Sequence, residues 1–165
     1  MLDTTHIHPM IVHFPIALLI IGFLFDFVGV VFKKEFFGKA AFYLLLLGTL
    51  GVVAAYISGN IAGGGITEAG SLKNAIEVHE EAALLTLWIM VITSIARVVL
   101  ILSKKYSGMY KWLALFMFLI GVLSVARTGY YGGELVFKHA AGVKFNLGNT
   151  FNLNDSEDNS NIKSE

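Results

Sequence analysis

Five histidines are the residues of this sequence whose type and placement point to chemistry. They are His6, His8, His13, His79 and His139. Neutral imidazole is the commonest metal ligand among side chains, so a cluster of histidines predicts a metal or cofactor site. Imidazole also suits the boundary between lipid headgroups and hydrocarbon, because one edge of the ring is polar and the rest is apolar. Which interpretation applies depends on where the chain places the rings.

Four long apolar segments must position these histidines. We expect membrane-spanning helices over residues 10–32, 40–58, 82–102 and 112–131. Each segment is close to the ~20 residues that a helix needs to cross ~30 Å of hydrocarbon. A helix also satisfies its backbone hydrogen bonds within the segment, as the bilayer core requires. The sequence therefore predicts an all-α, integral membrane four-helix bundle.

The composition supports a lipid environment and excludes several kinds of site. Hydrophobic residues make up 56% of the chain, against ~45–50% in an ordinary soluble protein. The net charge is zero, so there is no basic footprint for nucleic acid. The chain has no cysteine, which excludes disulfides, thiolate metal sites and covalent haem attachment through a Cys-x-x-Cys-His motif. Any metal site must use His, Met, Asp, Glu or backbone groups.

Charge in the loops predicts an orientation. Lysines gather in the loops after the first and third spans, at Lys33, Lys34, Lys39, Lys104, Lys105 and Lys111. The positive-inside rule then places these loops in the cytoplasm and both termini outside. We therefore expect a multi-pass protein of the bacterial inner (plasma) membrane with all five histidines on the periplasmic side.

Two spacings predict a contact between the first and third spans. His8 and Asp26 are 18 residues apart, and so are His79 and Arg97. Eighteen residues are five helical turns, so each pair lies on one helix face. Asp26 and Arg97 both lie seven residues before a lysine of the inner loops, and a lone charge at that depth is costly. We predict an Asp26–Arg97 ion pair of structural role, which brings His8 and His79 level at the outer end.

Other candidate residues lie at similar depth. On a regular helix His13 points about 140° away from His8. Arg127 lies at the outer end of the fourth span, where it is expected to pair with Glu80 or Glu81 or to bind a ligand carboxylate.

Glycines within the second and fourth spans have two interpretations. Gly48, Gly51 and Gly121 predict either close helix packing of the small-xxx-small kind or room for a flat macrocycle. No convincing internal repeat is evident in the sequence.

Two segments resemble the signature ends of a bacterial membrane family. Residues 8–19 read HPMIVHFPIALL, with two prolines and two histidines inside an apolar run, and residues 132–143 read GGELVFKHAAGV. Over residues 6–145 the chain resembles the uncharacterised family named domain of unknown function 2231. Ala140 stands where the family pattern has glycine, so the turn after His139 is expected to differ.

The resemblance implies a fold and a set of ligands. The family is four-helical and similar to the b-type cytochrome bundles of respiratory membranes, in which histidines on facing helices ligate haem iron from both sides. By this fold-level analogy, candidate ligands for haem b or another metal are His8, His13, His79 and His139. The analogy does not say which two of them pair.

Three functions are compatible with these features. The first is a haem b protein that passes electrons near the periplasmic face, with one histidine from each of spans one and three as axial ligands and with Arg127 holding propionates. The second is a copper site made of His8, Met10, His13 and His79, because imidazole and thioether suit copper. The third is a non-catalytic membrane scaffold or subunit of a larger complex that docks periplasmic or membrane partners. The partners expected for the chain are the lipid bilayer and a periplasmic or membrane redox partner, with an oligomer or a larger complex as its assembly.

A hydrolase or a transporter is not expected, and an electron carrier or a subunit is favoured over a stand-alone enzyme. No serine nucleophile or acid–base pair stands out near the histidines beyond Glu80 and Glu81 beside His79. Internal repeats and midplane ionisable residues, which are typical of transporters, are missing from the sequence pattern.

The chain is expected to form one four-span domain over residues 1–145. Residues 146–165 are rich in Asn, Asp and Ser, a composition that predicts a disordered polar tail.

Overall fold

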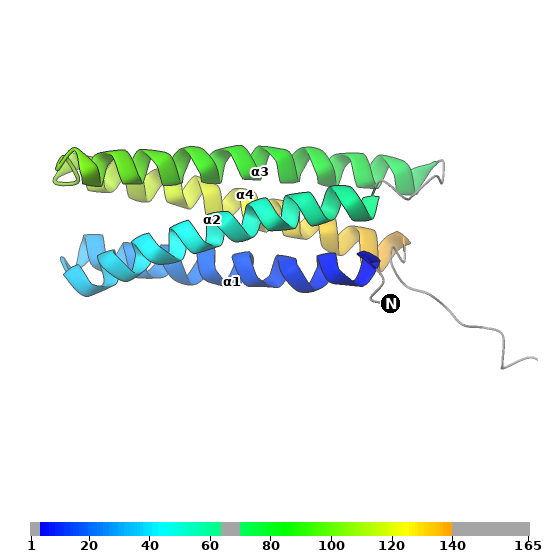
Figure 1. Cartoon of the computed structure of the whole chain (residues 1–165), viewed down its shortest axis with the longest axis horizontal. Helices are drawn as coiled ribbons and strands as arrows, with labels where there is room; N and C mark the ends of the chain where they lie inside the picture. Colours follow the sequence, from blue (N-terminus) through cyan, green and yellow to red (C-terminus); the bar gives the residue numbers. More distant parts are fainter. Residues whose placement is uncertain (1–3, 64–69, 140–165) are drawn as a thin grey trace, which may run out of the picture.

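A computed structural model describes residues 4–63 and 70–139. They form four helices, α1 (Thr4–Val31), α2 (Glu35–Gly63), α3 (Ser71–Leu102) and α4 (Met109–His139), without a strand in these ranges (Figure 1). Each helix is long and apolar enough to cross a membrane. The all-α membrane bundle predicted from the sequence is confirmed. The predicted polar tail at 146–165 lies outside the described residues.

Every helix extends beyond the apolar segment predicted for it. The helices have 28 to 32 residues, which corresponds to about 42–48 Å at 1.5 Å per residue. That length matches the ~40–45 Å of a bilayer that includes its headgroup layers. The additional turns are polar enough to lie among headgroups, which is why hydropathy alone underestimates the helices.

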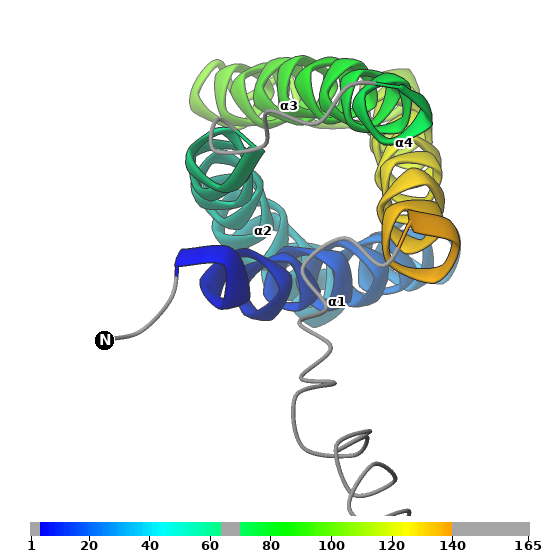
Figure 2. The same ribbon diagram turned by 90° about the vertical axis from the view of Figure 1, so that its right-hand side faces the viewer.

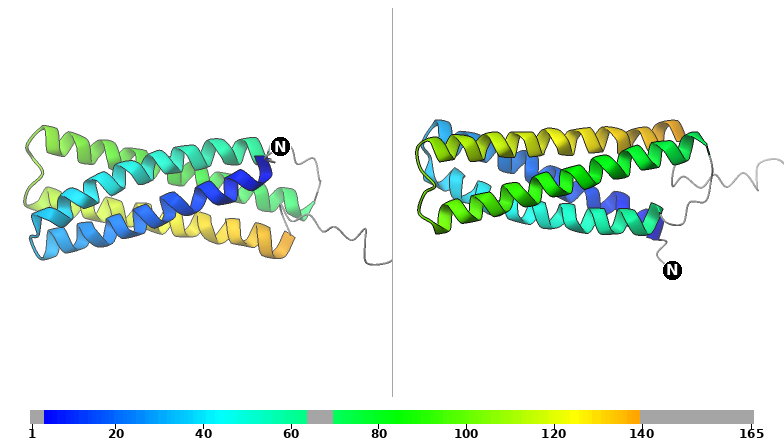
Figure 3. Two further views of the ribbon diagram at one scale, coloured as in Figure 1. Left: turned by 60° about the horizontal axis from the view of Figure 1, so that its bottom comes forward. Right: turned by 90° about the horizontal axis from the view of Figure 1, so that it is seen from above.

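The helices form an antiparallel ring in chain order. Each packs against the next along the chain, and α4 packs against α1, so α1 and α3 lie diagonally opposite (Figure 2). The two views of Figure 3 show the hairpin turns of α1–α2 and α3–α4 at one end of the bundle. We call this the lysine end, because Lys33, Lys34, Lys104 and Lys105 lie in its turns. The opposite end, which holds His8 and His79, is the histidine end.

The two hairpins, α1–α2 and α3–α4, are structural repeats. Leu19 of α1 and Met90 of α3 are both fully buried and 71 residues apart. Each lies against a glycine of the next helix, Gly48 or Gly121, and these glycines are 73 residues apart. The same 73-residue offset relates other buried pairs of α2 and α4, namely Ala41 and Ala114, Leu45 and Phe118, and Val52 and Val125. The bundle therefore has an internal pseudo-two-fold arrangement that the sequence did not reveal.

The buried glycines provide close helix packing. A Cβ atom on Gly48 would lie 2.5 Å from Leu19 Cδ2, and one on Gly121 would lie 2.5 Å from Met90 Sδ. A Cβ atom on Gly51 would lie 2.9 Å from the Pro15 ring. Of the two interpretations of these glycines, close packing is the one observed. Side chains, and not a macrocycle, occupy the bundle at this depth.

A buried ion pair crosses the bundle near the lysine end. Arg97 Nη1 donates to Asp26 Oδ2 at 2.8 Å, and Arg97 Nη2 donates to Asp26 Oδ1 at 2.6 Å. Asp26 has no exposed surface and Arg97 only 2%. The Tyr106 ring covers the guanidinium at 4.0 Å. The predicted ion pair between the first and third spans is confirmed, and it links the two diagonal helices.

The glycine packing predicts the effect of Gly48→Ala. The added methyl group overlaps Leu19, so we expect the free energy of unfolding to fall by about 1–3 kcal/mol. Thermal unfolding in detergent, followed by circular dichroism, measures the change. Gly129→Ala is the control, because a Cβ atom there meets nothing within 4 Å, and alanine in an open helical position is neutral or stabilising. Equal loss of stability in both variants would contradict the account.

The buried Asp26–Arg97 ion pair predicts that removing one charge destabilises the protein more than removing both. Asp26→Asn leaves the Arg97 charge buried without a counter-charge, so we expect a loss of about 3–5 kcal/mol in the free energy of unfolding. The double variant Asp26→Leu/Arg97→Met removes both charges and should recover much of that loss. Chemical or thermal unfolding of the three proteins tests this, and a double variant less stable than Asp26→Asn would refute it.

Candidate functional site

The histidine end brings together one imidazole from each of two diagonal helices. His8 lies in the first part of α1 and His79 in the first part of α3, and both side chains are half-buried. The two residues are 71 apart, the same offset that relates Leu19 to Met90 and Asp26 to Arg97. This shared offset supports the prediction that His8 and His79 lie at a common level.

A hydrogen-bond chain fixes the protonation of His8. Its Nδ1 lies 2.9 Å from Ser58 Oγ, and the Ser58 hydroxyl donates to the carbonyl of Ala55 at 2.9 Å. A serine hydroxyl has one proton, so Ser58 must accept the hydrogen bond from His8 Nδ1–H. In the neutral ring the lone pair is then on Nε2, which is the atom available to a metal or another donor.

His79 occupies the equivalent place in the second hairpin. The carbonyl of Thr128 lies beside its ring as that of Ala55 lies beside His8, and these two residues are 73 apart. His79 Nδ1 is buried and has no hydrogen-bond partner among the described residues. A buried polar atom without a partner is uncommon in proteins and marks this ring as a candidate for a ligand.

Glycines let both rings lie directly against the neighbouring helix. A Cβ atom on Gly59 would lie 3.0 Å from His8 Cε1, and one on Gly132 would lie 3.2 Å from His79 Cε1. These glycines are again 73 residues apart. Each hairpin therefore presents the same unit, a histidine on the first helix held against a glycine on the second.

Hydroxyl groups line the α3–α4 side of the site. Thr86 Oγ1 lies 2.6 Å from Ser124 Oγ and 2.8 Å from Thr128 Oγ1, and Thr128 donates to the Ala82 carbonyl at 3.0 Å. The α1–α2 side has Pro15 packed on Gly51 at the positions equivalent to Thr86 and Ser124. One wall is thus polar and satisfied, while the other is apolar.

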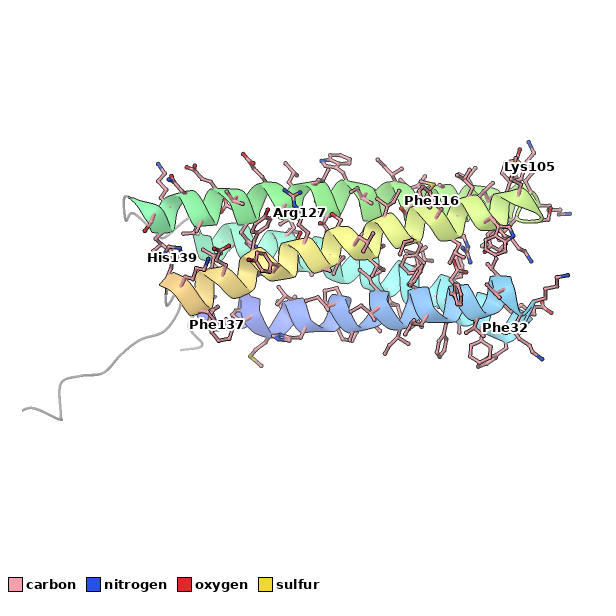
Figure 4. All side chains as sticks on the ribbon, turned by 180° about the vertical axis from the view of Figure 1, so that it is seen from behind. Phe32, Lys105, Phe116, Arg127, Phe137 and His139 are labelled. Atoms are coloured by element: carbon pink, nitrogen blue, oxygen red, sulfur yellow. The ribbon has the colours of Figure 1, made fainter. Side chains whose placement is uncertain are left out.

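Two other predicted ligands lie apart from this pair or at its edge. His13 is exposed on α1, and its Nδ1 bonds to the Pro9 carbonyl of its own helix, in keeping with the predicted 140° separation from His8. His139 is the last described residue of α4 and is half-buried (Figure 4). The side chain of His6 lies outside the described part of the molecule.

Arg127 lies on the exposed surface of α4 (Figure 4). Its guanidinium is 5.3 Å from the centre of the Tyr131 ring, and it forms no ion pair with a carboxylate of the described residues. The predicted pairing with Glu80 or Glu81 is therefore wrong. Glu80 points toward α2 instead, where a Cβ atom on Gly63 would lie 2.8 Å from its carboxylate.

The described residues do not provide a ligand set for a bare metal ion at the histidine end. Within residues 4–63 and 70–139, no three His, Asp or Glu side chains come together as metal ligands. Met10, a member of the hypothetical copper set, is 76% exposed, and His13 is exposed as well. The site therefore has two imidazoles, one from each hairpin, as its candidate ligands.

Sequence reasoning missed the residues that support the two imidazoles. Ser58, Gly59 and Gly132 were not singled out as site residues, and the internal repeat went unnoticed. The signal is present in the spacing, because His8 to Gly59 and His79 to Gly132 span 51 and 53 residues. It is hard to see because the intervening residues differ between the hairpins.

Comparison with known proteins agrees with the architecture. The family described as "Predicted membrane protein (DUF2231)" matches residues 4–145. No curated protein and no solved structure matches the chain. The matched region includes all four helices, His8, His79 and the buried ion pair, so this chain belongs to the DUF2231 family of membrane proteins.

Proposed function

We propose that this protein binds haem b between His8 and His79 and carries electrons at the histidine end of the bundle. The observation that supports the proposal is the equivalence of the two imidazoles under the pseudo-two-fold arrangement of the hairpins. Haem iron takes one axial ligand on each face of the macrocycle. Two identical side chains that approach from opposite sides of a bundle suit that requirement.

The chemistry of the two rings fits axial ligation. A ligating histidine usually donates its second N–H to a carbonyl, carboxylate or other acceptor, which fixes the tautomer and increases ligand basicity. His8 meets this condition through Ser58, with Nε2 left free. His79 Nδ1 makes no such bond among the described residues, and the Thr128 carbonyl is the backbone acceptor near its ring.

The site provides only two imidazole ligands, which favours a metal-containing cofactor over a bare metal ion. A protein site for a bare transition-metal ion usually supplies three or four side-chain ligands, and the described residues bring no three carboxylate or imidazole ligands together. A haem supplies four equatorial nitrogen ligands of its own, so two imidazoles complete the coordination. When bound, such a group supplies one-electron redox chemistry.

The position of the site supports exchange of electrons with a partner. Leu19 and Met90 fill the middle of the bundle, which keeps the cofactor near one membrane surface. By the distribution of lysines this surface is the periplasmic one of a bacterial inner membrane. The exposed Arg127 guanidinium is available there to an acidic side chain of a redox partner.

Absorption spectroscopy tests the proposal. We expect the protein purified from cells supplied with a haem precursor to show the Soret band and, after reduction, the sharp α band of six-coordinate low-spin haem. His8→Ala and His79→Ala should each lose the low-spin spectrum, because each removes one axial ligand.

His13→Ala is the matched control, because His13 lies in the same helix but on its exposed face. It should keep the wild-type spectrum. Circular dichroism and gel filtration establish that all three variants still form the bundle. A wild-type protein without haem, or a His13→Ala variant that loses the spectrum as His79→Ala does, would refute the proposal.

A further inference from the structure

A second site lies at the opposite end of the molecule. A cavity of about 640 Å³ opens at the lysine end between the ends of α1 and α3, the start of α2 and the turn before α4. It shares no residue with the histidine site. Five cationic side chains and two carboxylates line it, namely Lys33, Lys34, Lys39, Arg97, Lys111, Asp26 and Glu35.

The carboxylates leave much of the positive charge uncompensated. Asp26 is engaged by Arg97 through two hydrogen bonds. Glu35 pairs with Lys39 at 2.7 Å. Lys33, Lys34 and Lys111 form no ion pair with any described carboxylate. Three ammonium groups therefore line one cavity that holds more positive than negative side chains, an arrangement that favours binding of an anion.

The inner part of the cavity has a hydrogen-bond donor without an acceptor. Arg97 lines the cavity, is 2% exposed, and its Nε–H has no partner among the described residues. The Tyr106 ring, which also lines the cavity, covers the guanidinium at 4.0 Å. Burial is the main reason that the pKa of Tyr106 is raised, so its hydroxyl stays protonated at neutral pH. The Arg97 Nε–H is therefore the donor that remains for an oxyanion.

We propose that this cavity binds the phosphate group of an anionic membrane lipid. Basic pockets between transmembrane helices are a recognised mode of lipid headgroup binding. Phosphate oxygens would compensate Lys33, Lys34 and Lys111. The inference does not depend on haem binding at the other end of the bundle.

A neighbouring groove favours a lipid over a soluble phosphate. The groove has a volume of about 270 Å³ and shares Gly29, Val30, Lys33 and Lys111 with the cavity. Its other lining residues are Gly108 and Trp112. Trp112 is 55% exposed, and tryptophan prefers the level of the headgroups. A lipid with its phosphate in the cavity can therefore lay its glycerol and acyl region along this groove.

The turn between α3 and α4 provides a matched control, because it has the same lysine pair and the same backbone conformation as the turn between α1 and α2. Lys33 and Lys104 are 71 residues apart, and both have a left-handed backbone, with φ of 54° and 57°. Lys34 and Lys105 are related in the same way. Neither Lys104 nor Lys105 lines the cavity or the groove. Substitutions in this turn remove the same kind of charge from the same end of the bundle without touching the proposed site.

Lipid binding by native mass spectrometry tests the proposal on the full-length protein in a neutral detergent. The probes are phosphatidylglycerol, cardiolipin and, as a zwitterionic reference, phosphatidylcholine. We expect wild-type protein to bind the anionic lipids at least tenfold more tightly than phosphatidylcholine. Lys33→Gln/Lys34→Gln/Lys111→Gln should lose most of this preference, while Lys104→Gln/Lys105→Gln should keep it.

Inorganic phosphate distinguishes the two sources of the phosphate group. If millimolar phosphate raises the unfolding temperature of wild-type but not of the triple variant, the phosphate site is retained and its ligand is soluble. Equal lipid preference in the wild-type and triple-variant proteins would overturn the proposal. An equal loss in the Lys104→Gln/Lys105→Gln control would also overturn it, because the effect would then be one of general surface charge.

Discussion

The Asp26–Arg97 ion pair fixes how the two halves of this bundle align. It joins α1 to α3, helices that face each other across the ring and otherwise pack only on their neighbours. Charges buried in a membrane bundle are tolerated when they are paired and hydrogen-bonded. Sliding one helix by a turn would separate the carboxylate from the guanidinium by about 5 Å. The pair therefore selects one register, and in that register His8 and His79 share a level at the other end.

The pseudo-two-fold arrangement extends this alignment along the whole bundle. Buried positions of α3 follow those of α1 by 71 residues, and those of α4 follow those of α2 by 73. The equivalent positions of the two hairpins carry different residues at Asp26 and Arg97. Opposite charges at Asp26 and Arg97 can pair with each other, whereas two like charges could not. Identical histidines are retained at positions 8 and 79, which is the pattern that a ligand bound between the two hairpins would require.

Periodicity and spacing were sufficient to predict much of this fold. Four apolar segments of about 20 residues predict four helices, and matched 18-residue spacings predict the ion pair and the level of the histidines. The helix ends were underestimated because the outer turns are polar. The place of Arg127 was misjudged, since depth along a helix says nothing about which face a residue occupies. Arg127 lies on the exposed face, away from Glu80.

The supporting residues of the histidine site could not be predicted in the same way. Ser58 matters because its single proton is committed to the Ala55 carbonyl, and Gly59 because its missing side chain makes room for an imidazole. The first is a bond within α2 that matters because His8 of α1 reaches Ser58, and the second is a contact between the two helices. The roles of Ser58 and Gly59 can be seen only when the packing of α1 on α2 is known. The equivalent position of Ser58 in α4 is Tyr131, so a comparison of the two hairpin sequences does not point to Ser58.

The most direct test of the central claim is the proximity of positions 8 and 79 across the bundle in membranes. The chain has no cysteine, so a His8→Cys/His79→Cys variant has one defined thiol pair. We expect a short bifunctional maleimide to link these thiols efficiently within one molecule, detected by mass spectrometry of proteolytic fragments. The His13→Cys/His79→Cys pair should remain unlinked. Equal linkage of both pairs, or none at positions 8 and 79, would contradict the convergence of the two imidazoles.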